Sequence, residues 1–235
     1  MQPFASHTST DWVLVTGQPG CGKTTAVKTL VDELRASGAS VRGFYTDEVL
    51  SGGQRVGFDI VTVPDGLRGP LARKGAAGPK VGQYGVDVEG FERLALPTLE
   101  VDDDDDDNAT IYVLDEIGRM ELKSDVFAGR VQELLARGVR LVGAITAPIY
   151  GHRVAFCDRV SATRGVAVHK LTSKTRDGVT AELMRSLERW DGSGSDSDSG
   201  FETDRFADQR FGESEEDEDG NVTFPPKSGK RKRTK

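Results

Sequence analysis

One stretch near the N-terminus constrains the fold of this chain more than any other. Residues 17 to 24 fit the pattern G-x-x-x-x-G-K-[ST] at every position, and a second threonine follows. Glycines let the backbone turn around an anion with its N–H groups pointing inward, the lysine reaches the β- and γ-phosphates, and the threonine can bind Mg2+. We therefore expect a phosphate-binding loop made of Gly17, Gln18, Pro19, Gly20, Cys21, Gly22, Lys23, Thr24 and Thr25.

The flanks of this loop supply the context that the motif requires. Trp12 to Val15 is a short apolar run typical of a strand, and Lys23 to Ser37 carries apolar residues at helical spacing up to Gly38, a residue suited to a left-handed helix end. The positive N-terminal end of that helix would add to anion binding. The sequence thus predicts a strand, a glycine loop and a helix in succession.

Strands and helices continue to alternate along the chain. The expected strands are Val41 to Tyr45, Ile111 to Leu114, Leu141 to Ile145 and Gly165 to His169, and the expected helices are Val88 to Leu96, Ser124 to Arg137 and Asp177 to Trp190. Gly52-Gly53 separates two strand-like runs, which predicts a β-hairpin insertion. This alternation indicates an α/β fold, a mostly parallel sheet with helices on both faces, whose ligands bind at the carboxyl ends of the strands.

Asp115 and Glu116 directly follow the apolar run Ile111 to Leu114. Asp115 stands where a metal-binding aspartate would hold Mg2+ opposite Thr24, through a water molecule. A carboxylate directly after it can hold a water in line with the γ-phosphorus, so Glu116 is the candidate general base. The alternative is that Glu116 only caps the following turn.

Hydrolysis also needs a positive group at the γ-phosphoryl besides Lys23. Four arginines lie in segments that could supply it, and the residues alone do not choose among them: Arg119, Arg153, Arg164 and Arg176. The histidines show no metal-ligand spacing, so we expect no zinc.

Composition divides the chain into three parts. With 36% hydrophobic residues in 235, it can bury the core of one domain, which we place at residues 12–190, after a flexible N-terminus at 1–11. Six aspartates, Asp102 to Asp107, predict an acidic solvated loop at 100–108; a docking site for a basic partner is the alternative. Two cysteines and no signal peptide suit an intracellular compartment, and no apolar run could span a membrane.

The third part, residues 191–235, has the composition of a disordered tail, first acidic and then basic. It carries 12 acidic and 8 basic residues and so accounts for more than half of the net negative charge of the chain. The domain itself is therefore nearly neutral and offers no clear nucleic-acid surface. Serines followed by acidic residues suit an acidophilic kinase, and Lys230 to Arg233 suits an import receptor. The expected location is therefore cytoplasmic, nuclear or both.

Several segments together resemble the cancer-related nucleoside-triphosphatase, or THEP1, family. They are the loop Gly17 to Thr25, Gly43 to Val49, Gly57 to Val61, Arg68 to Leu71, Val81 to Asp87 and Leu114 to Leu122. The resemblance runs from about Trp12 to Trp190. It implies a RecA-like P-loop NTPase core and Mg-dependent hydrolysis of nucleoside triphosphates, ATP, GTP and others, to diphosphate and phosphate.

The resemblance also bears on the choice of arginine. The family's Thr-x-x-Asn-Arg-Asp appears here as Thr172 to Asp177, with Thr175 in place of asparagine and Arg176 retained. We therefore take Lys23, Glu116 and Arg176 as the catalytic candidates. Two other functions stay open: a small-molecule or nucleotide kinase, in which the glycine-rich segment Arg68 to Gly85 binds the acceptor, and a slow nucleotide-dependent binding switch.

Overall fold

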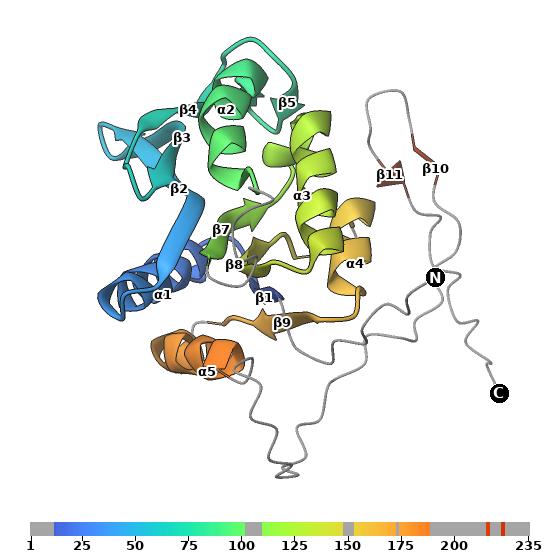
Figure 1. Cartoon of the computed structure of the whole chain (residues 1–235). Helices are drawn as coiled ribbons and strands as arrows, with labels where there is room; N and C mark the ends of the chain where they lie inside the picture. The colour runs from blue at the N-terminus through green and yellow to red at the C-terminus, as the bar shows by residue number, and fades with distance from the viewer. Residues whose placement is uncertain are drawn as a thin grey trace, which may run out of the picture. The chain divides into compact units, whose positions relative to one another are not determined.

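The structure is a computed structural model that describes residues 12–101, 110–147, 153–172, 174–188, 215–216 and 222–223 (Figure 1). The predicted flexible N-terminus, the aspartate run and nearly all of the tail lie outside these residues. The domain boundaries therefore stay predictions, as do the partners and the location inferred from the tail. The chain divides into a unit over Met1–Gly194 and a second over Ser195–Lys235. In the second unit, the strands β10 (Glu215–Glu216) and β11 (Val222–Thr223) pair antiparallel.

Nine strands of the first unit form one sheet, in the order β5-β6-β4-β3-β2-β7-β8-β1-β9. Strands β2, β7, β8, β1 and β9 run parallel, and the other four extend the sheet from β2 as antiparallel strands. The strands are β1 (Trp12–Thr16), β2 (Ser40–Ser51), β3 (Gln54–Val63), β4 (Arg68–Lys74), β5 (Lys80–Val81), β6 (Tyr84–Val86), β7 (Thr110–Ile117), β8 (Arg140–Ile145) and β9 (Val166–Lys170). The expected α/β fold with a mostly parallel central sheet is confirmed.

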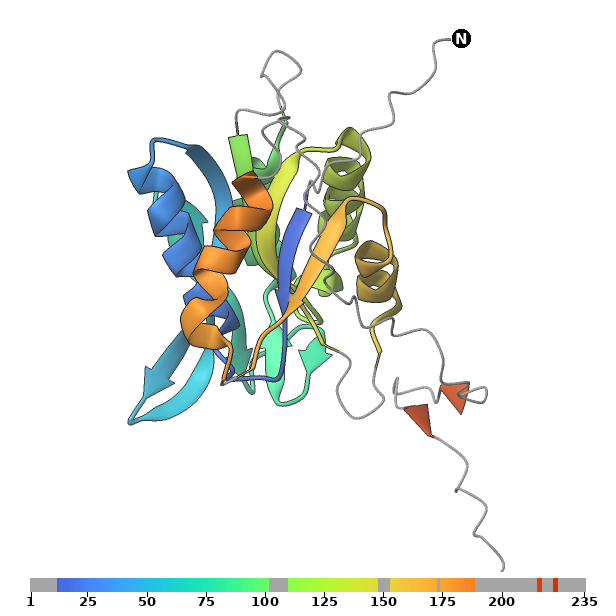
Figure 2. The same cartoon turned by 90° about the horizontal axis from the view of Figure 1, so that it is seen from below.

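Helices cover both faces of this sheet. The α-helices are α1 (Lys23–Ala36), α2 (Val88–Ala95), α3 (Asp125–Arg137), α4 (Ala155–Ser161) and α5 (Arg176–Glu188), and two short 3-10 helices are η1 (Leu96–Leu99) and η2 (Glu121–Lys123). Helices α1 and α5 lie on one face, and α2, α3 and α4 lie on the other (Figures 1 and 2). Within the described ranges, no helix is long and apolar enough to cross a membrane.

Burial on both faces explains the sequence of β1. Trp12 and Leu14 pack under α2, α3 and α4, whereas Val13 and Val15 pack under α1 and α5. Because successive strand residues point to opposite faces, a strand covered on both sides is an unbroken apolar run. The larger cluster is centred on three aromatic rings in edge-to-face contact, with centroids 5.2 to 5.9 Å apart: Phe44, Phe91 and Phe127.

Local sequence signals place most of the predicted elements correctly. Helix α1 ends before Gly38, whose φ of 86° is left-handed as predicted. The glycine pair between β2 and β3 also has positive φ, 57° and 75°, which is the geometry of a tight hairpin turn. Helix α3 begins after Ser124, whose hydroxyl accepts a hydrogen bond from the backbone N–H of Phe127, and it ends at Gly138.

Three features differ from the expectations. Helix α4 was not predicted, because its seven residues are too few to show a helical period. The antiparallel insertion is larger than one hairpin, since β4, β5 and β6 join it. Strand β7 does not end at Asp115; it continues to Ile117, and its pairing with β8 shifts register between Leu114 and Ile117. This irregularity falls at the two carboxylates, as bulges often do beside functional sites.

Strand β7 is held closely between two glycines on its neighbours. Gly43 of β2 lies opposite Val113, and Gly143 of β8 lies opposite Leu114. A Cβ atom at these glycines would come within 2.1 Å of the Val113 carbonyl oxygen and 1.9 Å of the Leu114 carbonyl oxygen. Both distances are far below van der Waals contact, so neither position has room for a side chain.

Candidate functional site

The phosphate-loop motif forms the connection between β1 and α1. Gly20 and Gly22 have φ values of 76° and 102°, which other residues rarely adopt, and the loop closes through a hydrogen bond from Cys21 N–H to Gln18 O of 3.2 Å. Lys23 Nζ donates to the Gly17 carbonyl oxygen at 3.3 Å, so the lysine folds back over the loop. These features match a cradle for an anion at the helix N-terminus.

Asp115 is brought directly to this loop. Its Oδ2 atom accepts hydrogen bonds from Thr24 Oγ1 at 3.0 Å, Thr46 Oγ1 at 2.7 Å and Thr46 N–H at 3.0 Å. The structure thus joins Thr24 and Asp115, which are 91 positions apart. Thr46, on β2, is a part of the site that sequence reasoning missed, because no short motif marks it.

The second oxygen of Asp115 is left without a partner. Asp115 is 1% exposed, and among the described residues its Oδ1 atom has no hydrogen bond. Burial raises the pKa of Asp115, while its hydrogen bonds from Thr46 and Thr24 lower it and the charge of Glu116 raises it further. An unpaired buried carboxylate oxygen is costly unless something occupies it. Asp115 and Thr24 are therefore the residues that could hold a divalent cation.

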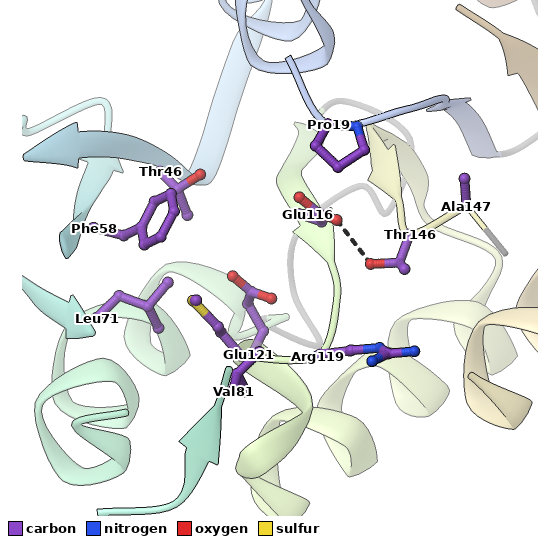
Figure 3. Close-up of a pocket in the computed structure, with 11 residues that line it drawn as sticks. Pro19, Thr46, Phe58, Leu71, Val81, Glu116, Arg119, Glu121, Thr146 and Ala147 are labelled. Atoms are coloured by element: carbon purple, nitrogen blue, oxygen red, sulfur yellow. Dashed lines mark hydrogen bonds between the residues drawn. The ribbon is translucent and has the colours of Figure 1, made fainter. Parts of the chain in front are cut away.

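Glu116, the predicted general base, is half-buried next to the loop. Thr146 Oγ1, just after β8, donates to Glu116 Oε1 at 2.7 Å. Figure 3 shows this hydrogen bond, with Pro19 of the phosphate loop above Glu116 in the view. The carboxylate is thus held by a specific contact and lines a pocket.

A further carboxyl group, that of Glu121, lies beside Glu116 and was assigned no role from the sequence. Glu121 is 4% exposed. A Cβ atom added at Gly118 would lie 2.9 Å from side-chain atoms of Glu116, Glu121 and Thr146, so the three side chains converge there. Burial raises the pKa of Glu121 well above its usual value of 4.5, and the charges of Glu116 and Asp115 raise it further. Its burial depends on the packing of η2, which the sequence does not reveal.

The four candidate arginines lie in different places. Arg176, the first residue of α5, places its Cδ atom 4.0 Å from where a Cβ of Gly22 would be, so it lies over the phosphate loop. Arg119 lines the pocket beside Glu116. Arg153 pairs with Asp158 at 2.9 Å. Arg164 precedes β9 at the amino edge of the sheet, about 16 Å from the site along a five-residue strand.

Glu116, Arg119, Glu121 and Thr146 line a pocket of about 370 Å³ at the carboxyl edge of the sheet. One part of its wall comes from the loop, β2 and β7, through Pro19, Thr46 and Glu116. The other part comes from the antiparallel extension, through Phe58 and Leu71 (Figure 3). The pocket thus lies where the nucleotide-binding core meets the insertion.

Among the described residues, no three His, Cys, Asp or Glu side chains gather as metal ligands. Cys157 Sγ donates to the Ile117 carbonyl oxygen at 3.2 Å, and burial raises the pKa of this thiol to about 12. His169 pairs with Glu182 at 2.9 Å.

The fold and the loop together define a class of protein. A glycine loop between a parallel strand and a helix, with a carboxylate of a second strand bonded to the loop threonine, is the arrangement of a P-loop NTPase. The sequence model of a protein family described as NTPase matches residues 12–184. The chain belongs to this family, that of the cancer-related nucleoside-triphosphatases and THEP1 proteins.

Individual relatives agree with this assignment. The cancer-related nucleoside-triphosphatase of Homo sapiens is 39% identical over 184 residues, which cover 75% of this chain and 96% of that protein. The nucleoside-triphosphatase THEP1 of Methanothermobacter thermautotrophicus is 44% identical over 180 residues, covering 77% and 98%. The solution structure of the human protein aligns with a TM-score of 0.66 at 38% identity, over 75% of this chain and 97% of that one. The crystal structure of THEP1 from Aquifex aeolicus aligns with a TM-score of 0.65 at 32% identity, over 76% and 99%.

Proposed function

We propose that this protein is a Mg-dependent nucleoside-triphosphatase that hydrolyses ATP, GTP and other nucleoside triphosphates to diphosphate and phosphate. The observation that carries the proposal is the hydrogen bond between Thr24 and Asp115. It places the carboxyl end of β7, and with it Glu116, against the loop that would hold the β- and γ-phosphates. The names of the relatives support the same activity.

The cation site fits Mg2+ better than a metal that needs several protein ligands. Mg2+ is usually bound by one or two carboxylates together with substrate phosphates and water. Asp115 and Thr24 offer one carboxylate and one hydroxyl, and the unpaired Oδ1 atom of Asp115 is an available acceptor. When bound there, Mg2+ would neutralise charge on the phosphates. Lys23, in the loop, and Arg176, which lies over it, would bind the same phosphates.

Glu116 would then activate the attacking water. Thr146 fixes one oxygen of its carboxylate, which leaves the other to accept a hydrogen bond from water. As the water oxygen bonds to the γ-phosphorus, its proton passes to Glu116, and the bond to the bridging oxygen breaks with its electrons going to the diphosphate.

The test is steady-state turnover of ATP, GTP, CTP and UTP by the full chain, with Mg2+ or with EDTA. We expect one phosphate released per triphosphate consumed, little discrimination among bases, and loss of turnover in EDTA. Lys23→Ala should weaken nucleotide binding, because it removes the positive charge that contacts the phosphates. Full turnover in EDTA would contradict the metal dependence, and no turnover of any triphosphate would contradict the activity.

A further inference from the structure

The pocket beside Glu116 is much larger than hydrolysis requires. A water molecule takes roughly 30 Å³ in the liquid, whereas this pocket holds about 370 Å³. That volume falls in the range of small-molecule sites, roughly 300 to 1,000 Å³. The terminal phosphate of a bound triphosphate would take only the part next to Pro19 and Thr46. The rest is lined by Glu116 and by residues of the insertion, so if Glu116 activates the nucleophile, as proposed above, this space admits a nucleophile larger than water.

The far wall of the pocket is apolar and comes from the insertion. Phe58 of β3, Leu71 of β4 and Val81 of β5 line it (Figure 3), and Met120 is a further apolar residue of the lining. Leu71 is only 1% exposed. A hydrolase would need no such wall around a water molecule, whereas an organic ligand would gain from burying its apolar surface against it.

The wall is firmly attached to the nucleotide-binding core. Within the insertion, the ring of Phe58 packs edge-on against Tyr84 of β6, with centroids 5.3 Å apart. Asp47 of β2 forms ion pairs with Lys28 of α1 and with Arg68 of β4. Because α1 begins at the phosphate loop, these contacts connect the insertion to the loop itself. The ion pairs of Asp47 thus join the insertion to α1 and β2 of the core.

The polar groups of the pocket favour an uncharged occupant with a hydroxyl group. Of the eleven described residues that line it, Glu116 and Glu121 are acidic and Arg119 is basic, and Arg119 is exposed. A ligand with a phosphate group would bring its negative charge next to the Glu116 carboxylate, with one exposed arginine to offset the repulsion. A hydroxyl group could instead donate a hydrogen bond to Glu116.

We propose that this pocket binds a small uncharged alcohol and that the enzyme transfers the γ-phosphoryl group to it, an activity that rests on the proposed binding of nucleoside triphosphate. The alcohol oxygen forms a bond to the γ-phosphorus. The bond from that phosphorus to the bridging oxygen breaks, its electron pair leaves with the diphosphate, and the alcohol proton passes to Glu116. Water and alcohol thus compete for the same phosphoryl group.

The test measures how the full chain partitions ATP between phosphate and phosphate ester, with thymidine, benzyl alcohol or thymidine monophosphate as probe. We expect thymidine or benzyl alcohol to lower phosphate release below ATP consumption, with the difference recovered as ester by 31P NMR. Stoichiometric phosphate release with both alcohols would overturn the proposal, and ester formation from thymidine monophosphate alone would overturn the uncharged occupant. If no ATP is consumed in any sample, the proposed hydrolase function fails, and this proposal falls with it.

A variant tests whether the phosphoryl transfer to alcohol takes place in this pocket. Val81 is half-buried on the short strand β5, and Val81→Trp would fill the pocket from the insertion side. Ester formation should fall at least about tenfold relative to phosphate release, equivalent to losing roughly 1.4 kcal/mol of alcohol binding. The matched control is Leu50→Trp, at a position that is 61% exposed near the β2–β3 hairpin turn, and it should partition like the wild type. Equal ester yields from Val81→Trp and wild type would refute this location.

Discussion

The buried carboxyl group of Glu121 predicts an unusual dependence of stability on pH. Its side chain is 4% exposed, and burial together with the nearby charges of Glu116 and Asp115 raises its pKa above the usual 4.5. Hydrogen bonds from the backbone N–H groups of Glu121 and Gly118 lower this pKa, but they offset only part of the increase. The ionised form is therefore disfavoured in the folded protein, and Glu121→Gln, which keeps the shape but cannot ionise, should remove the effect.

The sign and size follow from proton linkage. Between pH 4.5 and the raised pKa of Glu121, the folded state binds more protons than the unfolded state, so the free energy of unfolding falls as pH rises. This contribution is fully present below pH 4.5 and is lost as pH rises through the folded pKa. For one proton the slope reaches about 1.4 kcal/mol per pH unit. Glu121→Gln lacks this slope. The difference between its free energy of unfolding and that of the wild type should therefore grow in its favour as pH rises from 4.5 to the raised pKa of Glu121.

Urea unfolding in EDTA, without nucleotide, measures this difference at intervals from about pH 4 to pH 8. The control is Glu33→Gln, which changes an exposed glutamate on α1 and should follow the wild type within about 0.5 kcal/mol. If wild type and Glu121→Gln lose stability in parallel over this whole range, Glu121 does not ionise at a raised pKa, and the reasoning from its burial is wrong.

Three further predictions concern the site directly. Glu116→Gln should keep nucleotide affinity but lower turnover roughly a hundredfold, the effect of losing a general base. If this variant turns over as fast as the wild type, another residue is the general base. Asp115→Asn should raise the Mg2+ concentration needed for half-maximal turnover roughly tenfold or more, measured by Mg2+ titration, and an unchanged titration would rule Asp115 out of cation binding. Arg176→Ala should lower kcat/KM about tenfold or more, as expected for losing a charge-assisted hydrogen bond to phosphate. The control Arg164→Ala, at the opposite edge of the sheet, should match the wild type. Equal kcat/KM values for the two variants would contradict the placement of Arg176.

The sequence was sufficient where short-range rules decide the outcome. The loop from Gly17 to Thr24, the capping of α3 by Ser124 and the turn at Gly52-Gly53 depend on residues within a few positions of one another. The parallel arrangement followed from alternating periodicities, and it brought Asp115 to the correct edge.

Features set by distant contacts were not predictable in this way. Thr46 reaches Asp115 from a strand 69 positions away, and no motif of known chemistry singles out this threonine. The burial of Glu121 and the pocket wall formed by Phe58 and Leu71 depend on how the insertion packs against the core. Resemblance to a family identified the segments that contain these residues, but only the three-dimensional arrangement shows which side chains meet.

The two glycines that flank β7 have a consequence for natural variation and for library design. At Gly43 and Gly143, even an alanine methyl group would collide with the backbone of the strand that carries Asp115 and Glu116. The damage would be a displacement of β7 rather than a loss of any contact made by a side chain. A saturation library selected for activity should therefore be depleted of every substitution at these two codons, as strongly as at Lys23, although neither glycine is placed to touch the nucleotide.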